Sequence, residues 1–119
     1  MRLKHNEVKN LVREYMKGKG YSPLPSSFRK LGRNGSWPDD VFTKGDLHRK
    51  GRRLGSRSTV IMEYKTDLEA LLCLKGIGQL IYYSTMMRQD NCCLVLPQSH
   101  YLKLKDTLDR LPWLNTLSF

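Results

Sequence analysis

Residues 60–65, Val-Ile-Met-Glu-Tyr-Lys, constrain the fold of this chain more than any other stretch. A run of β-branched and apolar residues predicts a buried strand, and this run ends in an acid and a base two positions apart. Residues two apart on a strand project from the same face, so we expect Glu63 and Lys65 to point the same way, about 6.6 Å apart along the strand. A solvated salt bridge gives the same pattern, so the surrounding sequence has to decide between the two readings.

Helical and strand patterns alternate around this strand. Residues 4–17 predict an amphipathic helix with an inner face of Val8, Leu11, Val12 and Tyr15. Residues 21–37 predict a loop with at most one short edge strand, and residues 41–43 predict a strand. Later patterns predict a helix over about 68–87, a buried strand over 92–97, a helix over 99–111 and a terminal strand within 113–119. The chain therefore predicts one α/β domain over residues 1–119, a mixed central sheet flanked by helices.

The inner faces of the two later helices follow from the same spacing. Gly76 and Gly78 weaken the first of these helices, and they predict either a break or a close approach to the sheet. We expect Ser99 to cap the last helix. The inner face of helix 68–87 is predicted to contain Leu71, Leu72, Ile77, Leu80, Ile81 and Ser84, and that of helix 99–111 to contain Leu102, Leu104, Leu108 and Leu111.

The charge of the chain indicates a polyanionic partner. Lys and Arg number 21 against 11 Asp and Glu, a formal net charge of +10, which makes nucleic acid the expected partner. No apolar run approaches the roughly 20 residues that span a bilayer, and the N-terminus lacks the apolar core of a signal peptide. We therefore expect no membrane association and a cytoplasmic location. The three cysteines lack a metal-ligand spacing and are expected to be reduced, buried thiols.

Basic residues concentrate in two segments that we expect to contact the DNA backbone. Residues 44–57 hold six Lys or Arg against the single acid Asp46 and predict a long hairpin tip that acts as a phosphate-contacting arm. The loop before it is also basic. The expected DNA-binding residues are Arg29, Lys30, Arg33, Arg49, Lys50, Arg52, Arg53 and Arg57.

Two carboxylates are expected to meet beside the lysine. On adjacent strands, Asp39 and Glu63 would lie together at one end of the sheet with Lys65 next to them. Two close carboxylates bind a hard cation such as Mg²⁺ through oxygen and are costly to ionise together without it. A lysine there can orient water or offset charge on a phosphate. The predicted chemistry is metal-assisted attack on a phosphodiester.

The order of these motifs resembles the PD-(D/E)XK nuclease superfamily. It consists of Glu7, Pro38-Asp39, Glu63-Tyr64-Lys65 and then Gln79-x-x-x-Tyr83. The first-helix Glu resembles that of archaeal Holliday-junction resolvases, and the Gln-x-x-x-Tyr pair resembles the RecB and Cas4 nucleases. The resemblance covers about residues 4–97 and implies a restriction-endonuclease-like αβββαβ core.

The resemblance also implies the site residues and their roles. Asp39, Glu63 and the main-chain carbonyl of Tyr64 would bind Mg²⁺ or Mn²⁺, and Lys65 would be the catalytic base or electrostatic stabiliser. Glu7 would reach the metal directly or through water, although a first-turn acid that favours the helix dipole has the same pattern. Gln79 and Tyr83 would orient the lysine or contact the DNA. The implied activity is that of a divalent-metal-dependent deoxyribonuclease.

Three questions stay open in the sequence. Asp40 follows Asp39 where the family usually has an apolar residue, and we favour Asp39 as the ligand because it follows Pro38. The alternative function is a non-catalytic basic DNA-binding protein whose acids only hold the fold. A homodimer is plausible because a domain of this size offers little surface to a long duplex.

Overall fold

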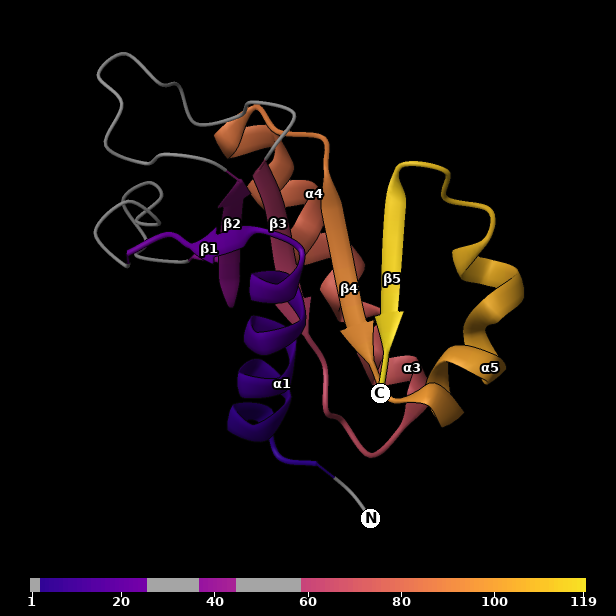
Figure 1. The fold of residues 1–119 in the computed structure, drawn as a ribbon. Coiled ribbons are helices and arrows are strands. Elements are labelled where there is room, and N and C mark those ends of the chain that lie inside the picture. The colour runs from indigo at the N-terminus through magenta and orange to yellow at the C-terminus, as the bar shows by residue number, and fades with distance from the viewer. Residues whose placement is uncertain (1–2, 26–36, 45–58) are drawn as a thin grey trace.

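The computed structural model describes residues 3–25, 37–44 and 59–119. A five-stranded mixed sheet lies between helices (Figure 1), with strand order β1-β2-β3-β4-β5. The strands are β1 (Tyr21–Pro23), β2 (Asp40–Lys44), β3 (Thr59–Tyr64), β4 (Cys92–Leu96) and β5 (Leu114–Ser118). The helices are α1 (His5–Gly18), α3 (Ala70–Cys73), α4 (Lys75–Met87) and α5 (Gln98–Leu108). The predicted α/β fold with a mixed sheet and flanking helices is confirmed.

The sheet changes from antiparallel to parallel pairing at its centre. β1 with β2 and β2 with β3 pair antiparallel, whereas β3 with β4 and β4 with β5 pair parallel. Helices connect the parallel strands, as parallel pairing requires. As a result, the start of β2 and the carboxyl ends of β3, β4 and β5 lie at the same end of the sheet.

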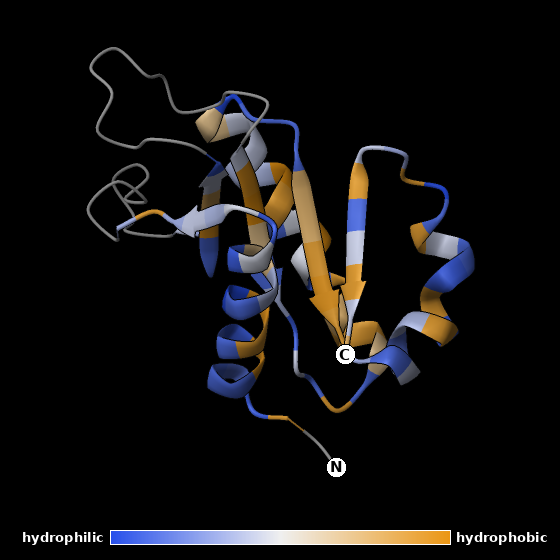
Figure 2. Ribbon diagram, viewed as in Figure 1, coloured by the Kyte–Doolittle hydropathy of each residue, from blue (hydrophilic) through white to orange (hydrophobic). Residues whose placement is uncertain are grey.

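Each face of the sheet has its own core. Val8, Val12 and Met16 of α1 pack on one face, against a cluster that includes Phe42 and Val95. Helices α3, α4 and α5 cover the other face. All five residues of β4 are buried, and Figure 2 shows β4 as hydrophobic along its length while α1 has a hydrophilic side. β4, which pairs with β3 on one side and β5 on the other, is therefore the interior strand buried on both faces that its apolar run predicts.

The predicted inner faces of the helices are partly wrong. The stripe of α1 is Val8, Val12 and Met16, whereas Leu11 and Tyr15 are exposed. An i, i+4, i+8 stripe fits a narrow contact with a sheet, and residues one position away point to its side. The last helix shows the same effect, since Leu104 and Leu108 are buried and Leu102 is exposed.

The long helix predicted over 68–87 is two helices. α3 ends at Cys73 and α4 begins at Lys75, so Leu74 separates them. The break changes the phase of the apolar face, because α4 buries Leu80, Tyr83 and Met87 instead of Ile81 and Ser84. Leu71 and Leu72 of α3 are exposed. Pro97, not Ser99, occupies the cap position of α5.

Candidate active site

Asp39 and Glu63 lie together across β2 and β3. The Asp39 backbone N–H donates to Glu63 Oε1 at 3.1 Å, and the Tyr64 backbone N–H donates to Asp39 Oδ2 at 2.8 Å. Asp40 pairs with Met62 in the ladder, so Asp39 lies opposite Glu63 one position further along. The register of the two strands therefore places the two predicted acids side by side at this end of the sheet.

Glu63 has an unusual electrostatic environment. Its side chain is only 3% exposed, and burial, together with the charge of Asp39 and a hydrogen bond between the two carboxyl groups, raises the pKa of Glu63 to about 8. The positive charge of Lys65 opposes this shift. The pair therefore holds a proton near neutral pH unless another cation replaces it.

Lys65 and Glu63 share the face of the sheet that α4 covers. The alternation along β3 puts Ile61 in the core on this face and Met62 and Tyr64 in the core on the α1 face. The side chain of Lys65 crosses α4 at Gly76, where an added Cβ would lie 3.1 Å from Lys65 Cε and 2.6 Å from Leu94 Cδ1. The lack of a side chain at Gly76 thus makes room for the lysine side chain, and the predicted close approach of this helix to the sheet occurs there.

Tyr83 faces the acids from α4, and Gln79 lies one turn before it. Tyr83 is buried, and burial together with the charges of Glu63 and Asp39 raises the pKa of its phenol to about 12. The neutral phenol is a hydrogen-bond donor near the carboxyl pair. Gln79 is exposed. Of this predicted pair, Tyr83 is buried where the charges of both acids act on it, and Gln79 is exposed on the same helix.

Asp40 points to the other face of the sheet and is fully buried. Arg13 of α1 donates from Nε to Asp40 Oδ2 at 3.1 Å and from Nη2 to Oδ1 at 2.8 Å, and the Tyr64 hydroxyl donates to Oδ2 at 2.7 Å. Hydrogen bonding to Asp40 raises the pKa of Arg13. Burial and the Asp40 charge raise the pKa of the Tyr64 phenol above its usual range. Asp40 therefore joins α1 to β2 and β3.

The first turn of α1 contributes His5 rather than Glu7. His5 Nε2 lies 3.3 Å from Asp39 Oδ1, and its ring packs edge-on against Tyr64 with centroids 5.9 Å apart. The carboxylate of Glu7 is exposed and accepts a hydrogen bond from the Lys4 backbone N–H at 3.2 Å. This bond is the helix-start role that competes with metal binding for Glu7.

Sequence reasoning missed both His5 and Arg13. His5 precedes Val8 and Val12 by three and seven positions, which places it on the stripe that faces the sheet. That spacing was the available signal for His5. No sequence signal pointed to Arg13, because a basic residue beside an apolar stripe is usually solvated.

The carboxylate oxygens at this end of the sheet are chemically suited to a hard divalent cation. Two carboxyl groups within hydrogen-bond reach of each other, one of them buried and raised in pKa, lose their mutual repulsion when a cation binds between them. Within residues 3–25, 37–44 and 59–119, no group of three or more His, Cys, Asp or Glu side chains could hold a metal ion. Any cation here would depend on the two carboxylates with main-chain or water oxygens.

The remaining sequence predictions divide by location. The eight predicted DNA-binding residues and residues 45–57 of the basic arm lie outside the described residues, whereas Lys44 is the last residue of β2. Cys73, Cys92 and Cys93 are buried free thiols, as predicted. In the described part of the chain, no helix is long and apolar enough to cross a membrane.

Comparison with known proteins gives no match to a family model, to a curated protein or to a solved structure. The functional assignment therefore depends on the geometry of the site.

Proposed function

We propose that this protein is a divalent-metal-dependent DNA nuclease with an Asp39–Glu63–Lys65 site on a restriction-endonuclease-like core. The observation that supports it best is the carboxyl pair held together by two hydrogen bonds from backbone N–H groups, Asp39 N–H to Glu63 and Tyr64 N–H to Asp39. The pair stands at the edge where the parallel strands end, which is where α/β sheets bind ligands. The order of α1, three antiparallel strands, the helices α3 and α4, and the parallel strand β4 supports this part of the proposal.

Each residue has a role that its position supports. Asp39 and Glu63, with the main-chain carbonyl of Tyr64, would hold Mg²⁺ or Mn²⁺. When bound, the ion would supply Lewis-acid activation of water and offset charge on the phosphate. Lys65, held against Gly76, would orient the attacking water or stabilise the developing negative charge with its ammonium. Tyr83 would donate a hydrogen bond to Glu63 or to the DNA.

Asp39 is the better candidate than Asp40 for the ligand. Asp40 is fully buried and already held by Arg13 and Tyr64, and removing a buried charge from its partners is costly. The side chain of Asp39 is 26% exposed. A water-borne ion can therefore reach Asp39.

His5 replaces Glu7 as the α1 residue closest to the acids. Its imidazole can position Asp39 through the 3.3 Å contact. In the proposed site Glu7 would act only if its bond to the Lys4 N–H opened.

A non-catalytic DNA-binding protein remains the second candidate function. The absence of a group of three ligating side chains within the described part of the chain favours it, as does the net charge of +10. It predicts DNA binding that weakens steeply with salt and no divalent-ion site.

Calorimetry with Mn²⁺ at pH 8.5 separates the two candidates. The parent protein should show one site, and Asp39→Asn or Glu63→Gln should weaken it at least about tenfold, since each removes a charged ligand. Glu14→Gln is the matched control, because Glu14 is an exposed acid of α1. A parent protein that gives no binding heat, or variants that bind like the parent, would contradict the nuclease proposal.

A further inference from the structure

A basic surface lies at the end of the sheet opposite the carboxyl pair, where α1, β1 and β2 meet. α1 begins beside Asp39 and ends at Gly18, and a turn at Gly20 leads from it into β1 (Figure 1). β1 pairs antiparallel with β2, and Tyr21 lies opposite Lys44, the last residue of β2. The C-terminal end of α1 and the end of β2 therefore come together away from the acids.

Two lysine side chains on this surface lie over tyrosine rings. Lys19 Nζ is 4.9 Å from the centroid of the Tyr15 ring, and Lys44 Nζ is 5.7 Å from the centroid of the Tyr21 ring. An added Cβ at Gly20 would lie 3.4 Å from Lys44 Cε, so the Lys44 side chain passes over the turn that follows Lys19. A tyrosine face attracts the cation above it. Both ammonium groups are therefore held on this surface by the protein itself.

The positive charges of this surface are accessible to a partner. Lys17, Lys19 and Lys44 are exposed, and Tyr15 is 48% exposed. Lys17 and Lys19 form no ion pair with any described residue. Accessible lysines that no nearby acid neutralises favour an anionic partner. We call these three lysines, with Tyr15 and Tyr21, the lysine–tyrosine surface.

We propose that the lysine–tyrosine surface binds the sugar–phosphate backbone of a DNA strand whose reacting phosphate lies at Asp39 and Glu63. The inference rests on the proposed nuclease function and adds the place where the protein holds its substrate outside the carboxyl pair. Lysines contact the backbone through its phosphates, and such contacts do not depend on the base sequence.

The separation of the two sites suits a short stretch of one strand. From His5 to Lys19, α1 rises about 21 Å along its axis, which equals about six nucleotides of a stacked strand at about 3.4 Å each. Figure 2 shows that the side of α1 turned away from the sheet is hydrophilic. A strand can therefore follow this side of α1, with one phosphate at the acids and another at the lysine–tyrosine surface.

A lipid bilayer fits this surface less well than DNA does. A helix that lies in a membrane interface inserts a broad apolar face into the lipid. The apolar stripe of α1, Val8, Val12 and Met16, is packed on the sheet instead. Leu11 and Tyr15 are the large apolar residues that α1 exposes, and two side chains do not make such a face.

Fluorescence anisotropy with a labelled single-stranded DNA of about 15 nucleotides, in EDTA, tests the proposal. The affinity of the parent protein should fall steeply as the salt concentration rises, because phosphate contacts release counterions. Lys19→Ala should raise Kd about fivefold at low salt and reduce the slope of log Kd against log salt by about 0.7, the value for one phosphate contact of a single strand. Adding Lys44→Ala should about double the loss of slope.

Three further variants separate a specific surface from net charge. Lys105→Ala removes an exposed lysine of α5, which covers the other face of the sheet, and should keep the parent slope. Tyr15→Leu keeps every charge but removes the ring under Lys19, so it should raise Kd about twofold, whereas Tyr15→Phe keeps a ring and should bind like the parent. Urea denaturation checks that each variant is folded.

Several results would overturn the proposal. They are a parent protein that does not bind the DNA, a Lys19→Ala protein with the parent slope, and a Lys105→Ala protein that loses as much slope as Lys19→Ala. Vesicles that contain phosphatidylserine form a second arm of the experiment. If Lys19→Ala weakens binding to these vesicles more than binding to DNA, the surface belongs to a membrane contact and the proposal is wrong.

The outcome is distinguishable from that of the nuclease proposal. Binding in EDTA uses neither metal nor cleavage, so DNA binding through the lysine–tyrosine surface by a protein that cuts no DNA overturns the nuclease assignment alone. Metal-dependent cleavage by a protein whose Lys19→Ala variant keeps the parent slope overturns the lysine–tyrosine surface alone.

Discussion

At the scale of single residues, Glu63 is the most constrained side chain in the candidate site. It is buried, next to Asp39, and close enough to Lys65 for the lysine to oppose the rise of its pKa. A structural acid in this position would be better replaced by an apolar residue, because burial of a like-charged pair is costly. The proposed cation-binding role accounts for the presence of two acids at this position.

The raised pKa of Glu63 predicts a pH-dependent stability in metal-free buffer. The pKa is about 8 in the folded protein against 4.5 in the unfolded chain, so the folded state binds the proton more tightly. This contribution is complete below pH 4.5 and is lost as the pH rises to 8. The free energy of unfolding should fall across that window, by about 1.4 kcal/mol per pH unit at most.

Urea denaturation with EDTA between pH 5 and 8.5 measures this slope. Glu63→Gln cannot titrate and should flatten it, whereas Glu14→Gln should keep the parent slope. A parent curve as flat as that of Glu63→Gln would show that Glu63 titrates normally.

Residue types and spacing were enough to predict that Asp39 and Glu63 lie side by side, because the register of adjacent strands brings them together. His5 and Arg13 required the packing of α1 on the sheet, which no local pattern encodes. The choice between Asp39 and Asp40 also required it, since only the partner of each side chain distinguishes two adjacent acids.

At the scale of elements, α1 and α4 hold the neighbouring strands β2 and β3 from opposite faces. The Arg13–Asp40–Tyr64 hydrogen bonds tie α1 to β2 and β3 directly behind Asp39 and Glu63. Gly76 brings α4 against Lys65 and Leu94. The carboxyl pair and the lysine are thereby fixed by rigid elements, as precise positioning of a site requires.

Gly76→Ala should destabilise the protein, by about 1–2 kcal/mol. The added Cβ would lie 2.6 Å from Leu94 Cδ1, and overpacking of a core outweighs the gain in helix propensity. Gly78→Ala is the matched control, because nothing lies within 4 Å of its Cβ, and it should stabilise by about 0.5–1 kcal/mol. Urea denaturation compares the two, and a Gly76→Ala protein as stable as Gly78→Ala would contradict the close approach.

The helices show why the sequence did not predict every element boundary. Leu71, Leu72 and Ile81 fit one continuous apolar face, but the break at Leu74 rotates that face, and α4 buries Tyr83 and Met87 instead. Just after the break, Gly76 lies against Leu94 of β4, and hydrophobic periodicity does not report such a tertiary contact.

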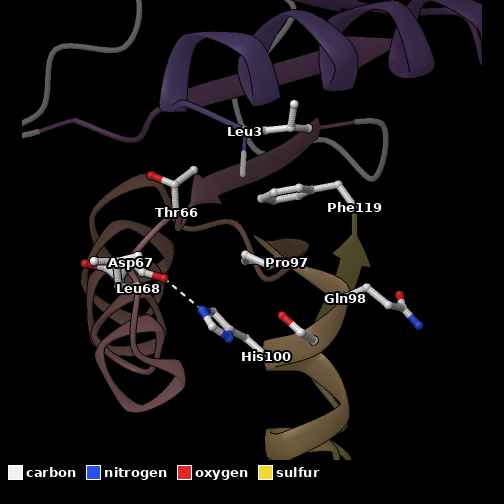
Figure 3. A pocket seen from close by; sticks show the side chains of 9 residues that line it. Leu3, Thr66, Asp67, Leu68, Pro97, Gln98, His100 and Phe119 are labelled. Atoms are coloured by element: carbon white, nitrogen blue, oxygen red, sulfur yellow. Dashed lines mark hydrogen bonds between the residues drawn. The ribbon is translucent and has the colours of Figure 1, made fainter. Parts of the chain in front are cut away.

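At the scale of the whole molecule, the net charge indicates the kind of partner, and the topology of the sheet indicates where it would bind. The net charge of +10 favours a polyanion, and the mixed sheet gathers Asp39, Glu63 and a pocket of about 350 Å³ by His100 (Figure 3) at the end of its parallel strands. The order of strands and helices followed from alternating patterns in the sequence. The pocket did not, because its walls come from segments that are distant in the chain.

A cleavage assay on a panel of labelled DNAs, single-stranded, duplex, flap and four-way junction, tests the nuclease proposal most directly. With Mg²⁺ or Mn²⁺ the parent protein should cut at least one of them, and EDTA should stop it. Glu63→Ala and Lys65→Ala should lose at least about a hundredfold in rate, whereas Lys75→Ala, which removes an exposed lysine of α4, should cut like the parent. Cleavage by Glu63→Ala or Lys65→Ala at the parent's rate, or no metal-dependent cleavage of any DNA by the parent, would contradict the account.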